Sequence, residues 1–221
     1  PVRKWLYQSP DQILIKASNG ASDFGNKFGQ PLITGSVLTF EHQEKGPAMD
    51  NHGDAQAPFY AYDKVIMLAG GVGYGTKRDC LKGEPQQGNK IVVVGGDNYR
   101  IGLGGGSVSS VDTGRYSNGI ELNAIQRANP EMQKRAYNLV RALVESDNNP
   151  VVSIHDHGSA GHLNCLSELV EECGGEIEMS ELPIGDKTLS AKEIIANESQ
   201  ERMGLLINKQ HIDEVRKIAE R

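Results

Sequence analysis

Short apolar runs separated by polar turns recur along the chain, and each run predicts a strand. In the second part of the chain we expect buried strands at residues 91–94, 151–154 and 202–207. In the first part we expect strands at residues 12–15, 36–40 and 60–69. The polar stretches 18–29 and 41–58 predict a loop and an exposed connection.

Helical spacing of apolar residues lies between these strands. Asn129 and Pro130 predict a helix start, because Asn caps the first turn and Pro has no N–H that needs a partner there. The apolar residues that follow recur at helical spacing: Met132, Ala136, Leu139, Val140, Leu143 and Val144. Ser190 and Glu193 form a capping box that opens a short helix.

Strand and helix therefore alternate over residues 90–221, with two more helices expected at 163–173 and 210–221. This alternation predicts an α+β (α/β-like) fold in which helices cover a mixed sheet. A polar stretch at 76–88 separates two apolar strands and predicts a domain boundary. The two expected domains are residues 1–80 and 81–221.

Composition excludes some classes of partner. The net charge is −6 with acidic and basic residues mixed along the chain, so we expect no nucleic-acid partner. No apolar run approaches the roughly 20 residues that cross a bilayer, so we expect no membrane partner. Three cysteines without CxxC spacing argue against a disulfide framework or a structural zinc site and favour the cytoplasm. A chain that begins at Pro1 and ends directly after an amphipathic helix is expected to be a piece of a longer protein.

A glycine-rich run at 101–110 follows the strand at 90–96. Glycine lacks Cβ, so backbone N–H groups can converge on an anion, and phosphate is the commonest anion in such loops. By itself the run is equally consistent with a tight turn.

A cluster of possible metal ligands follows the strand at 151–154. His155, His157 and His162 would suit a transition metal, whereas the single carboxylate of Asp156 suits Mg²⁺. We expect His155 and His157 on opposite faces of the strand end, which would prevent them from sharing one ion. Asp156 is therefore the better candidate, because the glycines around this turn leave room for a nucleotide–metal complex.

Polar side chains near two other element ends suit ligand hydroxyl and amide groups. Glu198, Ser199 and Gln200 precede the last strand, and Gln126 precedes the helix that Pro130 opens. Capping, turn chemistry or a fixed loop would explain the same residues. A Ser/His/Asp triad lacks the GxSxG elbow, so we discount hydrolase chemistry.

Taken together and in order, these motifs resemble the large-type phosphoribosylformylglycinamidine synthase (FGAM synthase) family, within the aminoimidazole ribonucleotide synthetase-like superfamily. The motifs that carry the resemblance are Val65-Ile-Met-Leu-Ala-Gly-Gly-Val-Gly73, Ile91-Val-Val-Val-Gly-Gly96, Ile101-Gly-Leu-Gly-Gly-Gly106, Ile125-Gln-Arg-Ala-Asn-Pro-Glu-Met132, His155-Asp156 and Asn197-Glu-Ser-Gln-Glu-Arg202. Phe28-Gly-Gln-Pro31 and Thr34-Gly-Ser36 resemble a segment just upstream in that family.

The resemblance implies a fragment of an ATP-dependent carbon–nitrogen ligase of de novo purine biosynthesis. Such an enzyme converts formylglycinamide ribonucleotide, ATP and glutamine to formylglycinamidine ribonucleotide, through an iminophosphate that ammonia attacks. It implies a glutaminase domain in the same full-length chain as a partner, and a homodimer of the fragment. The catalytic residue is expected upstream of Pro1, so the fragment alone is expected to be inactive.

The resemblance also implies site residues and a role for each domain. Residues 1–80 would be the tail of the ATP-binding domain, and residues 81–221 the C-terminal-type α+β domain. The residues implied for the ribonucleotide substrate are Gln126, Glu198, Ser199 and Gln200, and Asp156 is implied for Mg²⁺. The residues implied near ATP and its phosphates are Thr34, Gly35, Ser36, Gly104, Gly105 and Gly106.

The chain departs from the family pattern at one turn. Ser159 and Ala160 stand where Ala and Gly are usual, and His162 replaces an apolar residue. This difference questions a close backbone approach at 158–161.

Two other interpretations of the chain remain. One is a kinase or synthetase of the selenophosphate synthetase or thiamine-monophosphate kinase type, which needs an Asp-rich metal set near the start. The other is a non-catalytic structural interdomain module.

Overall fold

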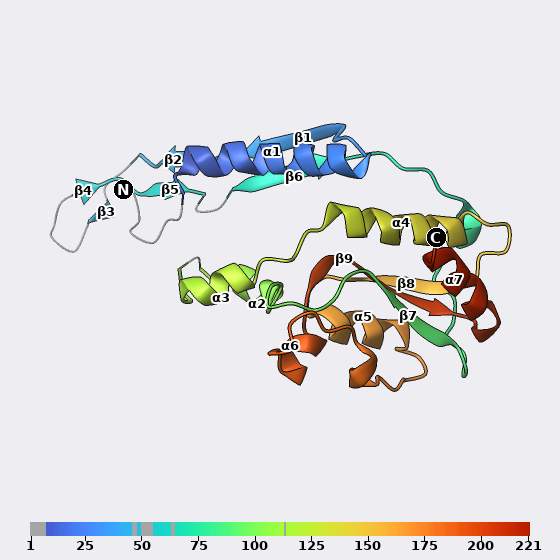
Figure 1. The fold of residues 1–221 in the computed structure, drawn as a ribbon. Coiled ribbons are helices and arrows are strands. Elements are labelled where there is room, and N and C mark those ends of the chain that lie inside the picture. The colour runs from blue at the N-terminus through green and yellow to red at the C-terminus, as the bar shows by residue number, and fades with distance from the viewer. Residues whose placement is uncertain (1–7, 46–47, 50–54, 63–64, 113) are drawn as a thin grey trace. The chain divides into compact units, whose positions relative to one another are not determined.

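The computed structural model describes residues 8–45, 48–49, 55–62, 65–112 and 114–221 (Figure 1). The chain divides into two compact units, Pro1–Tyr74 and Gly75–Arg221. We refer to them as the first and the second unit and describe each by itself.

The first unit begins with a long helix, α1 (Pro10–Phe28), so the predicted strand at 12–15 and loop at 18–29 are wrong. A short apolar run such as residues 13–15 suits a helix as well as a strand, and the end signals decide. Pro10 occupies the first turn, and Gly29 ends the helix in the left-handed conformation with φ 84°. The Gly29 N–H donates to the carbonyl oxygens of Gly25 and Asn26.

Three short antiparallel ladders follow α1 in nested order. β1 (Thr34–Leu38) pairs with β6 (Ile66–Gly70), β2 (Glu41–Gln43) with β5 (Phe59–Ala61), and β3 (Ala48–Met49) with β4 (Ala55–Gln56). The predicted connection at 41–58 therefore contains strands, and the predicted strand at 60–69 is two short ones. Polar composition concealed the strands at 41–58. Where the structure describes the side chains, β1, β2 and β5 are exposed at every position, so no buried face marks them.

The second unit is built on a three-stranded sheet in the order β7–β9–β8. β7 (Lys90–Val94), β8 (Val151–His157) and β9 (Ser199–Ile207) lie near the predicted strands. The α+β class is confirmed, but β9 pairs antiparallel with both neighbours, so the sheet is antiparallel rather than mixed. The central strand thus belongs to the last part of the chain.

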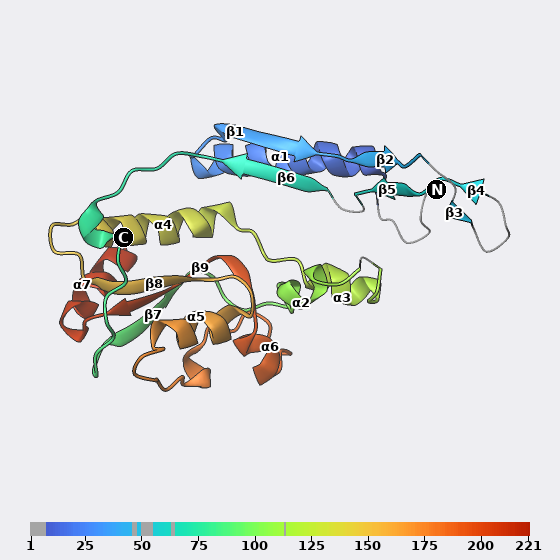
Figure 2. The ribbon, with the colours of Figure 1, turned by 180° about the vertical axis from the view of Figure 1, so that it is seen from behind.

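Helices cover both faces of this sheet (Figure 2). α4 (Pro130–Val144) and α7 (Ile212–Ala219) lie on one face and α5 (Gly161–Leu169) lies on the other. The side chains of β9 alternate between them. Leu205 and Ile207 pack in one buried cluster with Leu139, Leu143 and Val215. Leu206 packs in the other with Cys165, Leu166 and Leu169.

The predicted caps of the second unit are confirmed. The Asn129 side chain accepts from the Met132 N–H at 3.1 Å at the start of α4. Ser190 and Glu193 make the reciprocal capping box in front of α6 (Ala191–Ile195). α5 is shorter than predicted: it ends at Leu169, and Gly174, with φ 67°, closes the following turn by donating to the Val170 carbonyl. These caps depend on residues close in sequence, which is why the sequence reveals them.

The remaining elements of the second unit are short. They are α2 (Gly105–Ser109), α3 (Asn118–Asn123) and the 3₁₀ turns η1 (Lys77–Asp79), η2 (Met179–Glu181) and η3 (Lys209–His211). All three cysteines are free: Cys165 is buried, and burial raises the pKa of its thiol to about 12. Among the described residues, no helix combines the length and the apolarity needed to span a membrane.

Candidate functional site

Several predicted site residues of the second unit form hydrogen bonds to the carboxylate of Glu198. Its Oε1 accepts from the Gly106 N–H at 3.2 Å and from the Ala160 N–H at 3.3 Å. Its Oε2 accepts from the Gln126 side-chain amide at 3.0 Å. Glu198 is only 2% exposed, so these bonds replace the water that a carboxylate needs. Four segments that are distant in sequence therefore meet at one side chain.

Two glycines of the glycine-rich run pack tightly at this site. A Cβ on Gly105 would lie 2.5 Å from Glu198 Oε2 and 2.7 Å from the Ala124 carbonyl. On Gly106 it would collide with the Ser159 hydroxyl. In the structure, the anion beside Gly105 and Gly106 is the protein's own carboxylate. The predicted role of Gly104, Gly105 and Gly106 toward the phosphates of ATP stays a prediction.

The turn that contains Ser159 and Ala160 makes the close approach that its composition questioned. Ala160 has φ 63° and ψ 12°, and it is the one non-glycine residue with positive φ among those described. Its N–H nevertheless reaches Glu198. Because Cβ disfavours this left-handed conformation, the turn carries strain that Gly would not.

Ser199 and Gln200 lie directly beside the Gln126–Arg127 segment. Ser199 forms an isolated parallel bridge with Arg127, and the Gln200 N–H donates to the Arg127 carbonyl at 3.3 Å. Ser199 is buried, and its hydroxyl has no hydrogen-bond partner among the described residues. Gln200 is exposed, so its amide is accessible to a ligand.

Asp156 is exposed near the end of β8, where its Oδ1 accepts from the Gly158 N–H at 2.7 Å. Within the described ranges, no group of three or more His, Cys, Asp or Glu side chains could hold a metal ion. One carboxylate is nevertheless enough for Mg²⁺ when phosphate oxygens and water complete its shell. Asp156 thus fits a Mg²⁺ ion that arrives with a nucleotide.

The histidines near Asp156 do not form a transition-metal site. His155 pairs with Glu168 on α5 at 2.8 Å, whereas His157 Nε2 lies 3.0 Å from His162 Nδ1. Both His155 and His157 therefore contact α5, so the expectation of opposite faces is wrong, because residues two apart in a strand lie on the same face. The His155 and His157 rings do not share a ligand because each is held by its own partner, Glu168 for His155 and His162 for His157.

His157 and His162 form a buried, neutral chain with Asn98. His162 Nε2 lies 3.1 Å from Asn98 Oδ1, while the Asn98 amide N–H donates to the Pro183 carbonyl. This orientation makes His162 Nε2 the donor to Asn98 and His157 Nε2 the donor to His162 Nδ1. Burial lowers the pKa of His157 to about 2 and the pKa of His162 to about 3, and the positive charge of Arg202 adds to both shifts.

Arg202 ties the loop after β7 to the loop before β9. It is fully buried and donates to the backbone carbonyls of Gly96, Asp97 and Asn197. Burial lowers the pKa of its guanidinium to about 10, which still leaves it charged at neutral pH. Sequence reasoning did not assign Arg202 a role, although a charged residue at the head of an apolar strand was a signal that it is paired.

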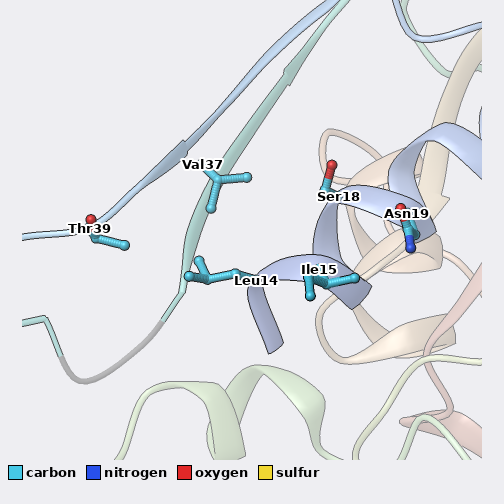
Figure 3. Close-up of a pocket in the computed structure, with 6 residues that line it drawn as sticks. All are labelled: Leu14, Ile15, Ser18, Asn19, Val37 and Thr39. Atoms are coloured by element: carbon cyan, nitrogen blue, oxygen red, sulfur yellow. The ribbon is translucent and has the colours of Figure 1, made fainter. Parts of the chain in front are cut away.

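Three of the predicted ATP residues, Thr34, Gly35 and Ser36, lie in the first unit. Thr34, Gly35 and Ser36 are in β1 opposite Gly70, Ala69 and Leu68 of β6. A Cβ on Gly35 would lie 2.8 Å from the Leu68 carbonyl, so the ladder itself requires this glycine. The first unit also has an open groove of about 410 Å³ between α1 and the chain around β1 (Figure 3). The groove is lined by Leu14, Ile15, Ser18, Asn19, Val37 and Thr39, and none of these is charged.

Comparison with known proteins tests the resemblance. The family described as AIR synthase related protein, C-terminal domain, matches residues 86–221, which is more than half of the chain. The chain belongs to this family. Its match covers β7, β8 and β9 and every residue around Glu198, so the candidate site lies in the family domain.

Curated relatives carry the name that the motifs predicted. The chain is 40% identical over 214 residues to the probable phosphoribosylformylglycinamidine synthase, chloroplastic/mitochondrial, of Arabidopsis thaliana. It is 38% identical over 209 residues to the phosphoribosylformylglycinamidine synthase of Homo sapiens. These alignments cover 96% and 94% of the chain but only 14% and 15% of the relatives. The resemblance is confirmed, and the chain spans a small part of the proteins that it matches.

Solved structures agree in fold. The chain is similar to T. maritima PurL complexed with FGAR, with a TM-score of 0.66 and 24% identity over 91% of this chain and 30% of that one. It is similar to PurLQS from Thermotoga maritima with a TM-score of 0.61 and 25% identity, over 91% of this chain and 29% of that one. The expected fold of the synthetase C-terminal-type domain is therefore confirmed.

Proposed function

We propose that the chain is a part of an FGAM synthase that binds formylglycinamide ribonucleotide at the cluster around Glu198. The convergence of Gln126, Gly106 and Ala160 on the Glu198 carboxylate carries this proposal. The names of the relatives and the FGAR complex of PurL support it. The enzyme would be an ATP-dependent ligase that converts this ribonucleotide and glutamine to formylglycinamidine ribonucleotide.

The polar groups of the cluster suit a substrate that is rich in hydroxyl and amide groups. Glu198 uses Oε2 to hold the Gln126 amide, which keeps a second N–H and a carbonyl for a ligand. Gln200 presents a second, exposed amide, and its main chain is tied to Arg127. Ser199 contributes a hydroxyl that has no partner among the described residues. In this arrangement Glu198 holds the site residues in place, and the side-chain amides of Gln126 and Gln200 form hydrogen bonds to the substrate.

Asp156 would hold the Mg²⁺ of Mg²⁺-ATP, and the ion would offset charge on the phosphoryl oxygens. PurL complexes with ATP and AMPPCP support ATP as a substrate. ATP would phosphorylate the formamide oxygen of the substrate, and ammonia would then displace phosphate from the resulting iminophosphate. Thr34, Gly35 and Ser36 would lie near ATP, and the Gly104–Gly106 loop would border its phosphates while it remains anchored to Glu198.

The remaining parts of the proposal concern the whole protein. Residues 1–80 would be the tail of the ATP-binding domain, and residues 81–221 the C-terminal-type domain. The full-length chain would carry a glutaminase domain that supplies ammonia, would act in the cytoplasm, and would pair with a second copy through these domains. Light scattering tests the pairing, since a monomeric mass would contradict it.

Calorimetric titration with formylglycinamide ribonucleotide and with Mg²⁺-ATP tests the site. We expect substrate binding by the full-length enzyme to be abolished by Gln200→Ala and to be unchanged by Gln87→Ala, which removes the same exposed amide from a turn. Unchanged binding in Gln200→Ala would contradict the assignment. If the unsubstituted enzyme did not bind the ribonucleotide at all, the structural-module interpretation would replace it.

Complementation tests whether the chain alone is inactive. The chain alone should fail to complement a purine auxotroph, because the catalytic residue is expected upstream of Pro1.

A further inference from the structure

We propose that Arg127 and Glu201 form a positioning pair that sets the spacing of Gln126 and Gln200 in the substrate site. This inference rests on the proposed function, because it concerns the two amides that would contact the ribonucleotide. Neither Arg127 nor Glu201 contacts the substrate in this proposal. They act through the residues beside them.

Glu201 is buried, Arg127 is partly buried, and more than one contact holds the guanidinium. The Arg127 Nε–H donates to Glu201 Oε1 at 2.5 Å, and the Nη2 group contacts the same oxygen. The Glu201 side chain is 0% exposed and that of Arg127 is 20% exposed. The guanidinium also lies over the Tyr99 ring, 4.9 Å from its centre. An edge contact and a face contact together leave the guanidinium little freedom.

The backbone of Arg127 joins both proposed substrate residues. Its carbonyl accepts from the Gln200 N–H at 3.3 Å, and Arg127 and Ser199 form a parallel bridge. Gln126 precedes Arg127 directly, and Gln200 precedes Glu201 directly. The Arg127–Glu201 ion pair therefore closes a ring of contacts through Arg127, Gln200 and Glu201, and Gln126 is bonded directly to this ring through Arg127. A shift of the ion pair would move both amides.

The surroundings are shaped for this pair. A Cβ on Gly96 would collide with the Arg127 guanidinium and lie 3.3 Å from Glu201 Oε1, so the glycine at the end of β7 makes room for the contact. Glu201 Oε2 is buried without a partner among the described residues. A buried pair whose acceptors are only half used gains little stability over apolar side chains of the same size. The Arg127–Glu201 pair therefore contributes a fixed geometry to the site rather than stability to the fold.

Steady-state kinetics of the full-length enzyme test the proposal, with Glu201→Gln and Arg127→Lys as variants. Arg127→Lys retains the charge but loses the planar fork and the stacking on Tyr99. We expect each variant to raise the KM for formylglycinamide ribonucleotide about tenfold or more, which is the effect of losing roughly 1.4 kcal/mol of binding. The KM for ATP should stay within about twofold, because the amides are not proposed to contact ATP.

The matched control is Glu145→Gln at the C-terminal cap of α4. Arg141 Nε and Glu145 Oε1 are also 2.5 Å apart, but both side chains are at least half exposed. This variant should leave both KM values unchanged. Since a merely structural defect would raise both KM values together or lower kcat alone, either of those results with Glu201→Gln and Arg127→Lys would overturn the proposal.

A double variant separates this inference from the proposed function. If the pair acts through Gln126, adding Glu201→Gln to Gln126→Ala should raise the KM for the ribonucleotide by less than it does in the unsubstituted enzyme. Full additivity would contradict positioning through Gln126. If Gln200→Ala itself had no effect on the ribonucleotide, the proposed function would fail first. Arg127→Lys keeps the test open if Glu201→Gln does not fold.

Discussion

The two units of this chain bury their side chains to very different degrees. In the second unit, helices cover both faces of the sheet, and Leu205 and Ile207 of the central strand are 0% exposed. In the first unit, Leu68 of β6 is 58% exposed, and Phe28 is the one buried apolar residue among those described. The difference follows from topology, because β9 has a strand on each side and helices on both faces, whereas each strand of the first unit has one partner.

This contrast shows where specific chemistry can be built. A buried carboxylate, a neutral histidine pair and a buried arginine need surroundings that exclude water and supply hydrogen bonds. The second unit provides them around Glu198, His157 and Arg202. Two-stranded ladders are marginal by themselves and cannot hold such groups. The described part of the first unit therefore presents exposed backbone and polar side chains, such as Thr34 and Ser36, rather than a buried site.

The largest expected difference between the units is in backbone protection. Amide hydrogen exchange of the intact chain should be slower in β7, β8 and β9 than in β1 and β6, by on the order of 10³-fold. The reason is that opening the sheet exposes two apolar clusters, whereas opening a ladder exposes little. Exchange followed by mass spectrometry of peptides measures this, and equal protection of the two units would break the comparison.

Truncation of one leucine in each unit is the next test. Leu205→Ala should lower the free energy of unfolding by about 3–5 kcal/mol, because it opens a cavity between the sheet and α4. Leu68→Ala should cost less than about 0.5 kcal/mol, since that side chain already faces solvent. Urea unfolding monitored by circular dichroism gives both values. Similar costs would mean that β6 is buried in solution.

Acid should weaken the second unit through its histidine chain. The unfolded rings bind protons near their ordinary pKa of 6.5, whereas burial holds the folded pKa of His157 near 2 and that of His162 near 3. Between these values the unfolded state binds more protons, so stability is present above pH 6.5 and is lost as the pH falls. From pH 7 to pH 5 the loss should be about 2 kcal/mol for each ring.

Urea unfolding at pH 7 and pH 5 measures this loss. A stability that did not fall between pH 7 and pH 5 would show that the buried rings are hydrated or charged in the folded state.

The smallest expected effect concerns the strained turn. Ala160→Gly should raise the free energy of unfolding by about 1 kcal/mol, because Gly adopts the left-handed conformation without the penalty of Cβ. Ala21→Gly in α1 is the matched control and should be destabilising by about 1 kcal/mol, since Gly is unfavourable inside a helix. Thermal unfolding compares the two, and a destabilising Ala160→Gly would contradict the assigned conformation.

Several elements were predictable because their signals are local. Asn129 and Pro130 began a helix as predicted, and the box of Ser190 and Glu193 formed. The apolar run at 13–15 misled because its pattern suits both a helix and a strand, and only Pro10 and Gly29 separate them. The strands at 41–58 were missed because no apolar face marked them.

The sequence marked Gln126 and Glu198 as candidates, but it did not reveal the contact between them. Gln126 and Glu198 are 72 positions apart, and nothing in their local sequence shows that one holds the other. Arg127 and Glu201 were part of the quoted motifs and were not assigned a role, because burial of an ion pair depends on neighbours from other elements. The roles of Thr34, Gly35, Ser36 and Asp156 remain predictions.

Motif order and end signals are written along the chain, so the family, the order of the elements in the second unit and their caps could be predicted from the amino-acid sequence. Which groups meet depends on how the chain folds in space. The antiparallel pairing of β9 with β7 and β8 brings Glu198 to the glycine-rich loop and encloses His157 and Arg202. Those contacts are long-range, and burial alters the charge state of a side chain in ways that its position in the sequence does not record.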